Sequence, residues 1–150
     1  MSNQIDLTIT FEVKQSPDEV FNAINNVRGW WSGNIEGSTD ILGEEWTYRY
    51  QDIHYSKQKI TKLVTNKNVT WHIIDSYISF VKDKQEWTGT DIVFDISNGD
   101  DKTLLTFTHL GLVPSIACYD KCAPAWDYYI NESLFKLITT GTGVPNIVEK

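Results

Sequence analysis

Basic residues are scarce in this 150-residue chain. It has 13 Lys and Arg against 20 Asp and Glu, which gives a formal net charge of −7 at pH 7. Nucleic acids and anionic membrane surfaces bind proteins through clustered Lys and Arg, so the balance argues against both as partners. No apolar run is long enough to span a membrane. The opening MSNQIDLTITFEV lacks the basic and apolar regions of a signal peptide, which predicts a cytoplasmic protein.

Cysteine and histidine are also few. The two cysteines, Cys118 and Cys122, have a C-x3-C spacing that places them one helical turn apart, which suits a disulfide poorly. Two thiols are too few for a structural zinc site, so reduced cysteines without a metal are predicted. The three histidines, His54, His72 and His109, show no metal-ligand spacing such as H-x-x-x-H.

Motifs for cofactors and activated nucleophiles are absent as well. The chain has no P-loop, no dinucleotide-binding fingerprint and no G-x-S-x-G. The glycines of TGTGVP, residues 140–145, follow a predicted helix rather than opening one, so they do not indicate a phosphate site. We therefore predict no cofactor and no metal, and we assign no catalytic residue.

Aromatic residues, by contrast, are abundant. Six Trp, seven Tyr and six Phe make up 13% of the chain. Each ring carries a large apolar area, so this content is typical of a bulky core or of a pocket walled by aromatic rings. Composition alone does not choose between the two. The length fits one domain with a single core, residues 1–150.

The first part of the chain predicts a strand and a short helix. Residues 5–13, IDLTITFEV, alternate apolar and polar side chains, as a half-buried strand does. SPDEVFNAI then predicts a helix that begins with a capping box between Ser16 and Glu19. The pair Trp30–Trp31 follows in a turn or second short helix. Neighbouring helical residues point about 100° apart, so we predict that Trp30 packs in the core and Trp31 is partly exposed at a cavity entrance.

The rest of the chain predicts a sheet and a long helix. Residues 35–110 form successive strands with short turns, which favours antiparallel pairing. Ile60 and Leu63 are out of phase in their strand, which indicates a bulge or a twist. Residues 114–141 carry apolar side chains at helical spacing, with Pro124 opening the regular part of the helix. The predicted fold class is α+β: a curved antiparallel sheet wrapped around a long C-terminal helix, with two short helices after the first strand.

Several segments in this order resemble the SRPBCC superfamily, the helix-grip proteins that include START lipid-binding domains and birch-pollen-allergen-like proteins. The matching pieces are SPDEVFNAI with the following WW, WTGTDIVFDI at 87–96, TLLTFTHLGL at 103–112, AWDYYINESL at 125–134 and TGTGVP. They are most similar to the bacterial branch named after the C-terminal domain of the activator of the heat-shock-protein-90 ATPase. The resemblance implies a helix-grip fold with a cavity between sheet and helix. Because such proteins include carriers, cyclases and co-chaperone domains, it does not fix a function.

The resemblance places a set of strand and helix residues on the cavity wall. His109 would lie near the mouth and orient a ligand, and a structural histidine bonded to the backbone is the alternative. Asp127 and Tyr129 are considered with it as acid–base groups. The twelve candidate ligand-binding residues are Trp30, Trp31, Trp46, Tyr48, Trp71, Ile73, Phe94, Phe107, His109, Trp126, Tyr129 and Ile130.

Three functional hypotheses follow. The first is a small cytoplasmic protein that binds an apolar or aromatic small molecule, such as a lipid, in the cavity. The second is a cyclase or hydrolase that uses the same cavity, and the third is a stress protein that interacts with a chaperone. An open apolar cavity favours binding, two convergent titratable groups favour catalysis, and a closed interior favours protein interaction. The sequence favours binding over catalysis, and a weak homodimer is a further expectation.

Overall fold

One antiparallel sheet forms the body of the protein. The computed structural model describes residues 6–31 and 33–145, and within them the strand order is β1-β7-β6-β5-β4-β3-β2, which brings the first strand beside the last. The strands are β1 (Leu7–Val13), β2 (Asn34–Gly37), β3 (Glu45–Tyr50), β4 (His54–Val64), β5 (Asn68–Ile78), β6 (Asp91–Asn98) and β7 (Thr103–Leu110). The sequence pattern does not predict the short β2, and Ile5 of the first predicted strand lies outside the described residues.

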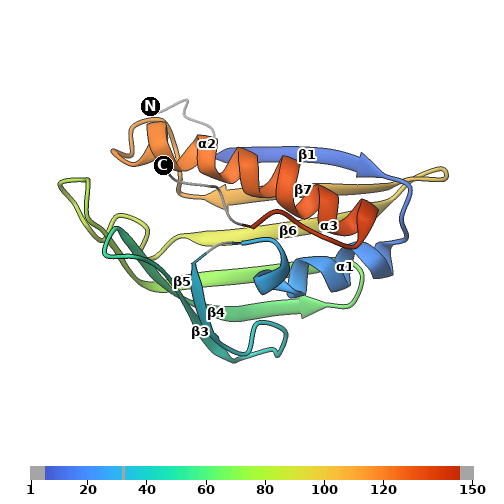
Figure 1. The fold of residues 1–150 in the computed structure, drawn as a ribbon, viewed down its shortest axis with the longest axis horizontal. Helices are drawn as coiled ribbons and strands as arrows, with labels where there is room; N and C mark the ends of the chain where they lie inside the picture. Colours follow the sequence, from blue (N-terminus) through green and yellow to red (C-terminus); the bar gives the residue numbers. More distant parts are fainter. Residues whose placement is uncertain (1–5, 32, 146–150) are drawn as a thin grey trace.

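A long helical segment lies across one face of the sheet (Figure 1). It consists of α2 (Tyr119–Asp127), a π-helical segment η2 (Tyr128–Leu134) and α3 (Phe135–Thr140). Gly141 ends it with a φ of 87°, a conformation that glycine adopts without strain, as its place in TGTGVP predicts. The sheet and this helix confirm the α+β helix-grip fold.

The start of the long helix differs from the prediction. Pro124 lies inside α2, five residues after Tyr119, so the expectation that it opens the regular helix is wrong. A proline removes one N–H donor and crowds the carbonyl four residues earlier. The beginning of α2 is held by a carboxylate of the β5–β6 connection, described below.

The buried face of the helix repeats every four residues. Trp126, Ile130, Leu134 and Ile138 are all buried against the sheet. Four residues advance an α-helix by about 40° more than one turn, so this repeat would drift around a regular helix. The wider π-helical turns of η2 counteract that drift and keep the four side chains in line.

Two short helices follow β1, as predicted. The helix α1 (Pro17–Asn25) begins with the expected capping box: Glu19 N–H donates to Ser16 Oγ at 3.2 Å, and Ser16 N–H donates to Glu19 Oε1 at 3.0 Å. A 3-10 turn, η1 (Val27–Gly29), comes next. It directs the chain across the end of the sheet, where the tryptophan pair enters the core.

The two tryptophans do not diverge. Trp30 is 0% exposed, which confirms its place in the core, but Trp31 is only 3% exposed, so its predicted partial exposure is wrong. Their rings are nearly parallel, with centroids 6.1 Å apart and an interplanar angle of 10°. The 100° rule applies to helical residues, whereas Trp30 has left the helical conformation, with a φ of −134° and a ψ of −22°. The backbone turns between them and points both indoles inward.

The predicted irregularity of β4 is confirmed. Its pairing with β5 shifts between Ile60 and Lys62, so one extra residue returns Leu63 to the inner face. A second shift lies between Lys57 and Gln58. These bulges bend the two longest strands and contribute to the curvature of the sheet around the helix.

The cysteines form a disulfide, which overturns the expectation of reduced thiols. Cys118 and Cys122 are bonded, with 5.6 Å between their Cα atoms, inside the range that disulfides span. Cys118 is the N-cap residue of α2, and its carbonyl accepts the Cys122 N–H at 2.7 Å. The disulfide therefore joins two residues one helical turn apart.

Candidate functional site

A pocket opens where β3, β4, the β5–β6 connection and α2 meet. Its volume is about 310 Å³, at the lower end of the range for small-molecule sites. Ile53 and Phe80 are exposed large apolar residues at its rim. The lining residues are Trp31, Tyr48, Tyr50, Ile53, His54, Phe80, Trp87, Lys121, Cys122, Ala125, Trp126 and Tyr129.

Aromatic rings in mutual contact form the walls. Trp31 stacks on Tyr48 with centroids 4.2 Å apart and lies 5.1 Å from the ring of Trp126. Trp126 is in turn parallel to Trp87 at 6.0 Å. Rings packed in this way are rigid and offer flat apolar faces, so they suit a flat apolar guest. Tyr129, in the π-helical segment, also lines the pocket.

His54 is the imidazole of the pocket. It begins β4, and its ring meets Trp87 edge-on at 4.4 Å and Tyr48 at 5.3 Å. Its Nε2 is buried and has no hydrogen-bond partner within the described part of the chain. Burial among these rings lowers the pKa of His54 to about 4, so the imidazole is neutral at pH 7.

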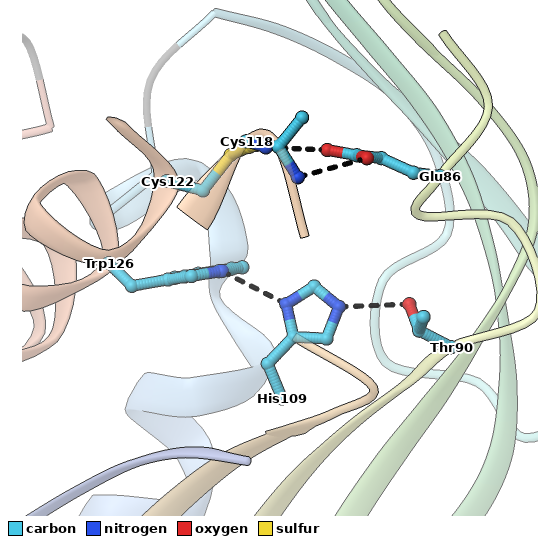
Figure 2. Close-up of a disulfide and its surroundings, with 7 residues drawn as sticks. Glu86, Thr90, His109, Cys118, Cys122 and Trp126 are labelled. Atoms are coloured by element: carbon cyan, nitrogen blue, oxygen red, sulfur yellow. Dashed lines mark hydrogen bonds between the residues drawn. A yellow bond between two sulfur atoms is a disulfide. The ribbon is translucent and has the colours of Figure 1, made fainter. Parts of the chain in front are cut away.

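His109 lies behind the pocket wall and is fully hydrogen-bonded (Figure 2). The indole N–H of Trp126 donates to His109 Nδ1 at 3.1 Å. An indole nitrogen is a donor only, so Nδ1 is the accepting nitrogen and Nε2 carries the proton. Nε2 then donates to Thr90 Oγ1 at 2.9 Å, and Thr90 Oγ1 donates to the Trp87 carbonyl at 2.6 Å.

This chain of hydrogen bonds holds His109 in its neutral form. Burial first, and repulsion from His54 second, lower the pKa of His109 to about 3. The His109 ring thereby connects Trp126, a wall residue, to Thr90, directly before β6. His109 is therefore structural, bonded to side chains rather than to the backbone as the sequence suggested.

Glu86 connects the two sides of the pocket mouth. From the β5–β6 connection its carboxylate accepts the N–H of Cys118 at 2.6 Å and that of Ala117 at 3.3 Å (Figure 2). These donors lie at the N-terminal end of the long helix, where unpaired N–H groups and the helix dipole favour a negative charge. Glu86 thus caps α2 and holds it beside Trp87.

We expect Glu86→Ala to lower the free energy of unfolding by about 1–3 kcal/mol, because two N–H groups lose a charged acceptor. Urea denaturation measures this. Glu86→Gln, which keeps an amide oxygen as acceptor, should cost less. Glu12→Ala is the control: its exposed carboxylate pairs with an exposed Lys102, so the change should stay within about 0.5 kcal/mol. A Glu86→Ala effect no larger than that of Glu12→Ala would contradict the cap.

The structure brings four of the twelve sequence-predicted residues to the pocket. Trp31, Tyr48, Trp126 and Tyr129 line it. The other eight are buried in the core around it: Trp30, Trp46, Trp71, Ile73, Phe94, Phe107, His109 and Ile130. Five of these eight contact the wall from behind: Trp30, Trp46 and Trp71 pack on Trp31, and Phe107 and His109 pack on Trp126, with 4.7 Å between the centroids of Phe107 and Trp126.

The three acid–base candidates do not converge. Tyr129 lines the pocket, whereas His109 lies behind Trp126. Asp127 is exposed, and its Oδ1 accepts the side-chain N–H of Asn131 at 2.7 Å. Catalysis by these three residues together is therefore not favoured by the geometry.

Sequence reasoning missed the residues of the mouth. Trp87 is 2% exposed and contacts both buried histidines, yet it lies in a connection without periodic pattern. Its indole nitrogen is buried without a partner among the described residues. A large apolar residue in a polar loop, KDKQEWTGT, is a signal that points to it, and Trp87 also opens the matching piece WTGTDIVFDI.

Metal and membrane sites find no support in the described residues. Within 6–31 and 33–145, no group of three His, Cys, Asp or Glu side chains is placed to hold a metal ion. Over the same ranges, every helix is too short or too polar to cross a lipid bilayer.

Comparison with known proteins supports the fold. No family model and no curated protein matches the sequence. Among solved structures, the Aha1 dimer of Colwellia psychrerythraea is 23% identical over 93% of this chain and 99% of its own, with a TM-score of 0.73. CalU16 of Micromonospora echinospora is 16% identical over 95% and 72%, with a TM-score of 0.65.

DynU16, a protein of the dynemicin biosynthetic locus, is similar at 13% identity and a TM-score of 0.65; the match covers 95% of this chain and 49% of DynU16. At these identities the likeness concerns the fold and not the activity. The comparison therefore confirms the helix-grip fold that the sequence resemblance to the SRPBCC superfamily predicted.

Proposed function

We propose that this protein binds an apolar or aromatic small molecule in the pocket at the mouth of the helix-grip interior. One observation carries the proposal: a cavity of about 310 Å³ is open to solvent and walled by contacting aromatic rings, with a few polar groups among them. A closed interior would favour a chaperone-interacting protein, and two converging acid–base groups would favour a cyclase or hydrolase. Neither arrangement is what the described residues form.

Binding of N-phenyl-1-naphthylamine, a neutral fluorescent aromatic, tests this proposal. We expect one molecule to bind per chain with enhanced emission. Ala125→Leu, which adds bulk at a lining position, should weaken binding about tenfold or more, because the added atoms occupy the space of the probe. Ala123→Leu is the matched control on the same helix, since Ala123 does not line the pocket, and it should bind like the wild type.

Two outcomes would contradict the proposal. The first is the absence of probe binding to a folded wild-type protein. The second is an Ala125→Leu affinity equal to that of Ala123→Leu, which would place the probe elsewhere. Native mass spectrometry of protein purified from its own host would identify a ligand that co-purifies.

We further propose a cytoplasmic location and a weak homodimer. The first rests on the sequence and the second on one comparison, since the Colwellia protein is described as a dimer. Sedimentation velocity over a range of concentrations tests the second. A sedimentation coefficient that does not rise with concentration would contradict it.

A further inference from the structure

Two ring nitrogens of pocket-lining residues are buried without a partner among the described residues. Trp87 Nε1 is one of them. An indole N–H can only donate, so the group that satisfies it must be an acceptor. His54 Nε2 is likewise buried and unpaired. A buried donor without a partner costs free energy, which an acceptor atom on a bound molecule would recover.

Charge at the pocket has one sign. Lys121 is the charged side chain among the described lining residues, and none of those residues carries a carboxylate. Glu86, the nearest acid in sequence to Trp87, is engaged with the N–H groups of Ala117 and Cys118. Lys121 is exposed on α2 and forms no ion pair within the described part of the chain. The pocket therefore carries a positive charge in a protein whose net charge is −7.

We propose that the ligand is an aromatic carboxylic acid, or a molecule with an equivalent anionic oxygen group on a flat apolar body. The body would lie against the wall that Trp31, Trp87 and Trp126 form, and the carboxylate would face Lys121. An oxygen of the ligand would accept the Trp87 N–H. This inference rests on the proposed function and specifies its substrate class.

A pair of isosteric probes tests the charge. The carboxylate 2-naphthoate and the neutral 2-naphthamide share a ring system and differ in the head group. At low ionic strength we expect naphthoate to bind about 2- to 5-fold more tightly, the range that an ion pair at a solvent-exposed rim contributes. The preference should shrink as salt is added, because ions screen the exposed pair. Both affinities follow from quenching of tryptophan fluorescence.

Lys121→Met should abolish the preference for naphthoate, which is the ratio of the two probe affinities measured in the same variant. Lys62→Met is the matched control: it removes the same charge from an exposed residue of β4 that does not line the pocket, and it should keep the preference. Both positions are exposed, so neither variant should unfold.

Three outcomes distinguish a failure of the anionic-ligand inference from a failure of the proposed binding function. Naphthoate preference lost only in Lys121→Met supports the anionic ligand. Equal binding of the two probes, or a preference that survives Lys121→Met, overturns the inference and leaves the binding function intact. Absence of binding by both naphthalenes and by N-phenyl-1-naphthylamine overturns the proposed function itself.

Discussion

Trp31→Ala is expected to lower the free energy of unfolding by about 3–5 kcal/mol, as much as Trp30→Ala, because both indoles are buried and both leave a large cavity. Trp30 stacks at 6.4 Å on Trp71 and donates its N–H to the Ile24 carbonyl at 3.1 Å. Trp31 stacks on Tyr48 at 4.2 Å. Urea denaturation followed by far-ultraviolet circular dichroism measures both variants without relying on tryptophan emission.

The two variants should differ in ligand binding. Trp31 lines the pocket and Trp30 does not, so the milder Trp31→Phe should weaken N-phenyl-1-naphthylamine binding while Trp30→Phe preserves it. Phenylalanine keeps an aromatic ring at each site and limits the loss of stability. If Trp31→Ala leaves stability unchanged while Trp30→Ala unfolds the protein, Trp31 is instead a mobile entrance residue, as divergent indoles would require.

Periodicity predicted the strands and the helix face well because burial alternates along β3, β6 and β7. Trp46 and Tyr48 share the inner face of β3, and Phe94 and Phe107 share that of their hairpin, as the pattern requires. Periodicity says which face of an element is buried. It does not say how far along the element a cavity extends, because the whole face has one pattern.

The pocket occupies only one end of that face. Tyr48 lines it, whereas Trp46, two residues along the same strand and on the same side, is covered by Trp31 and Trp71. The register that pairs Tyr50 with His54 places the imidazole at the open end. How far the pocket extends along the strands depends on strand pairing and on where the helix begins. Neither can be read from the sequence of a single strand.

The mouth itself depends on contacts between distant segments. Glu86 reaches the beginning of α2 across 32 positions of sequence, and Trp87 packs beside Trp126 where that contact joins the connection to the helix. Loop residues carry no repeating pattern, so their burial follows from such tertiary contacts. The sequence therefore predicts the residues of the pocket's inner wall but not those of its rim.

Acidification from about pH 7.5 to about pH 5 is expected to lower the free energy of unfolding by about 4 kcal/mol. In the folded protein the pKa values of His54 and His109 are about 4 and about 3, below the ordinary value of 6.5. Between these values and 6.5 the unfolded chain binds more protons than the folded one. Stability is therefore complete above pH 6.5 and falls as the pH decreases toward the folded-state values.

The two imidazoles contribute about equally to this loss. At pH 5 both folded-state pKa values lie below the pH, so His109 and His54 should each account for about 2 kcal/mol. His54→Phe removes one titrating group and leaves no new unpaired atom, so it should reduce the dependence by about half. Urea denaturation at both pH values measures the change. Equal unfolding free energies at the two pH values would mean that protons reach both rings in the folded state, and that the hydrogen bonds joining Trp126, His109 and Thr90 open freely in solution.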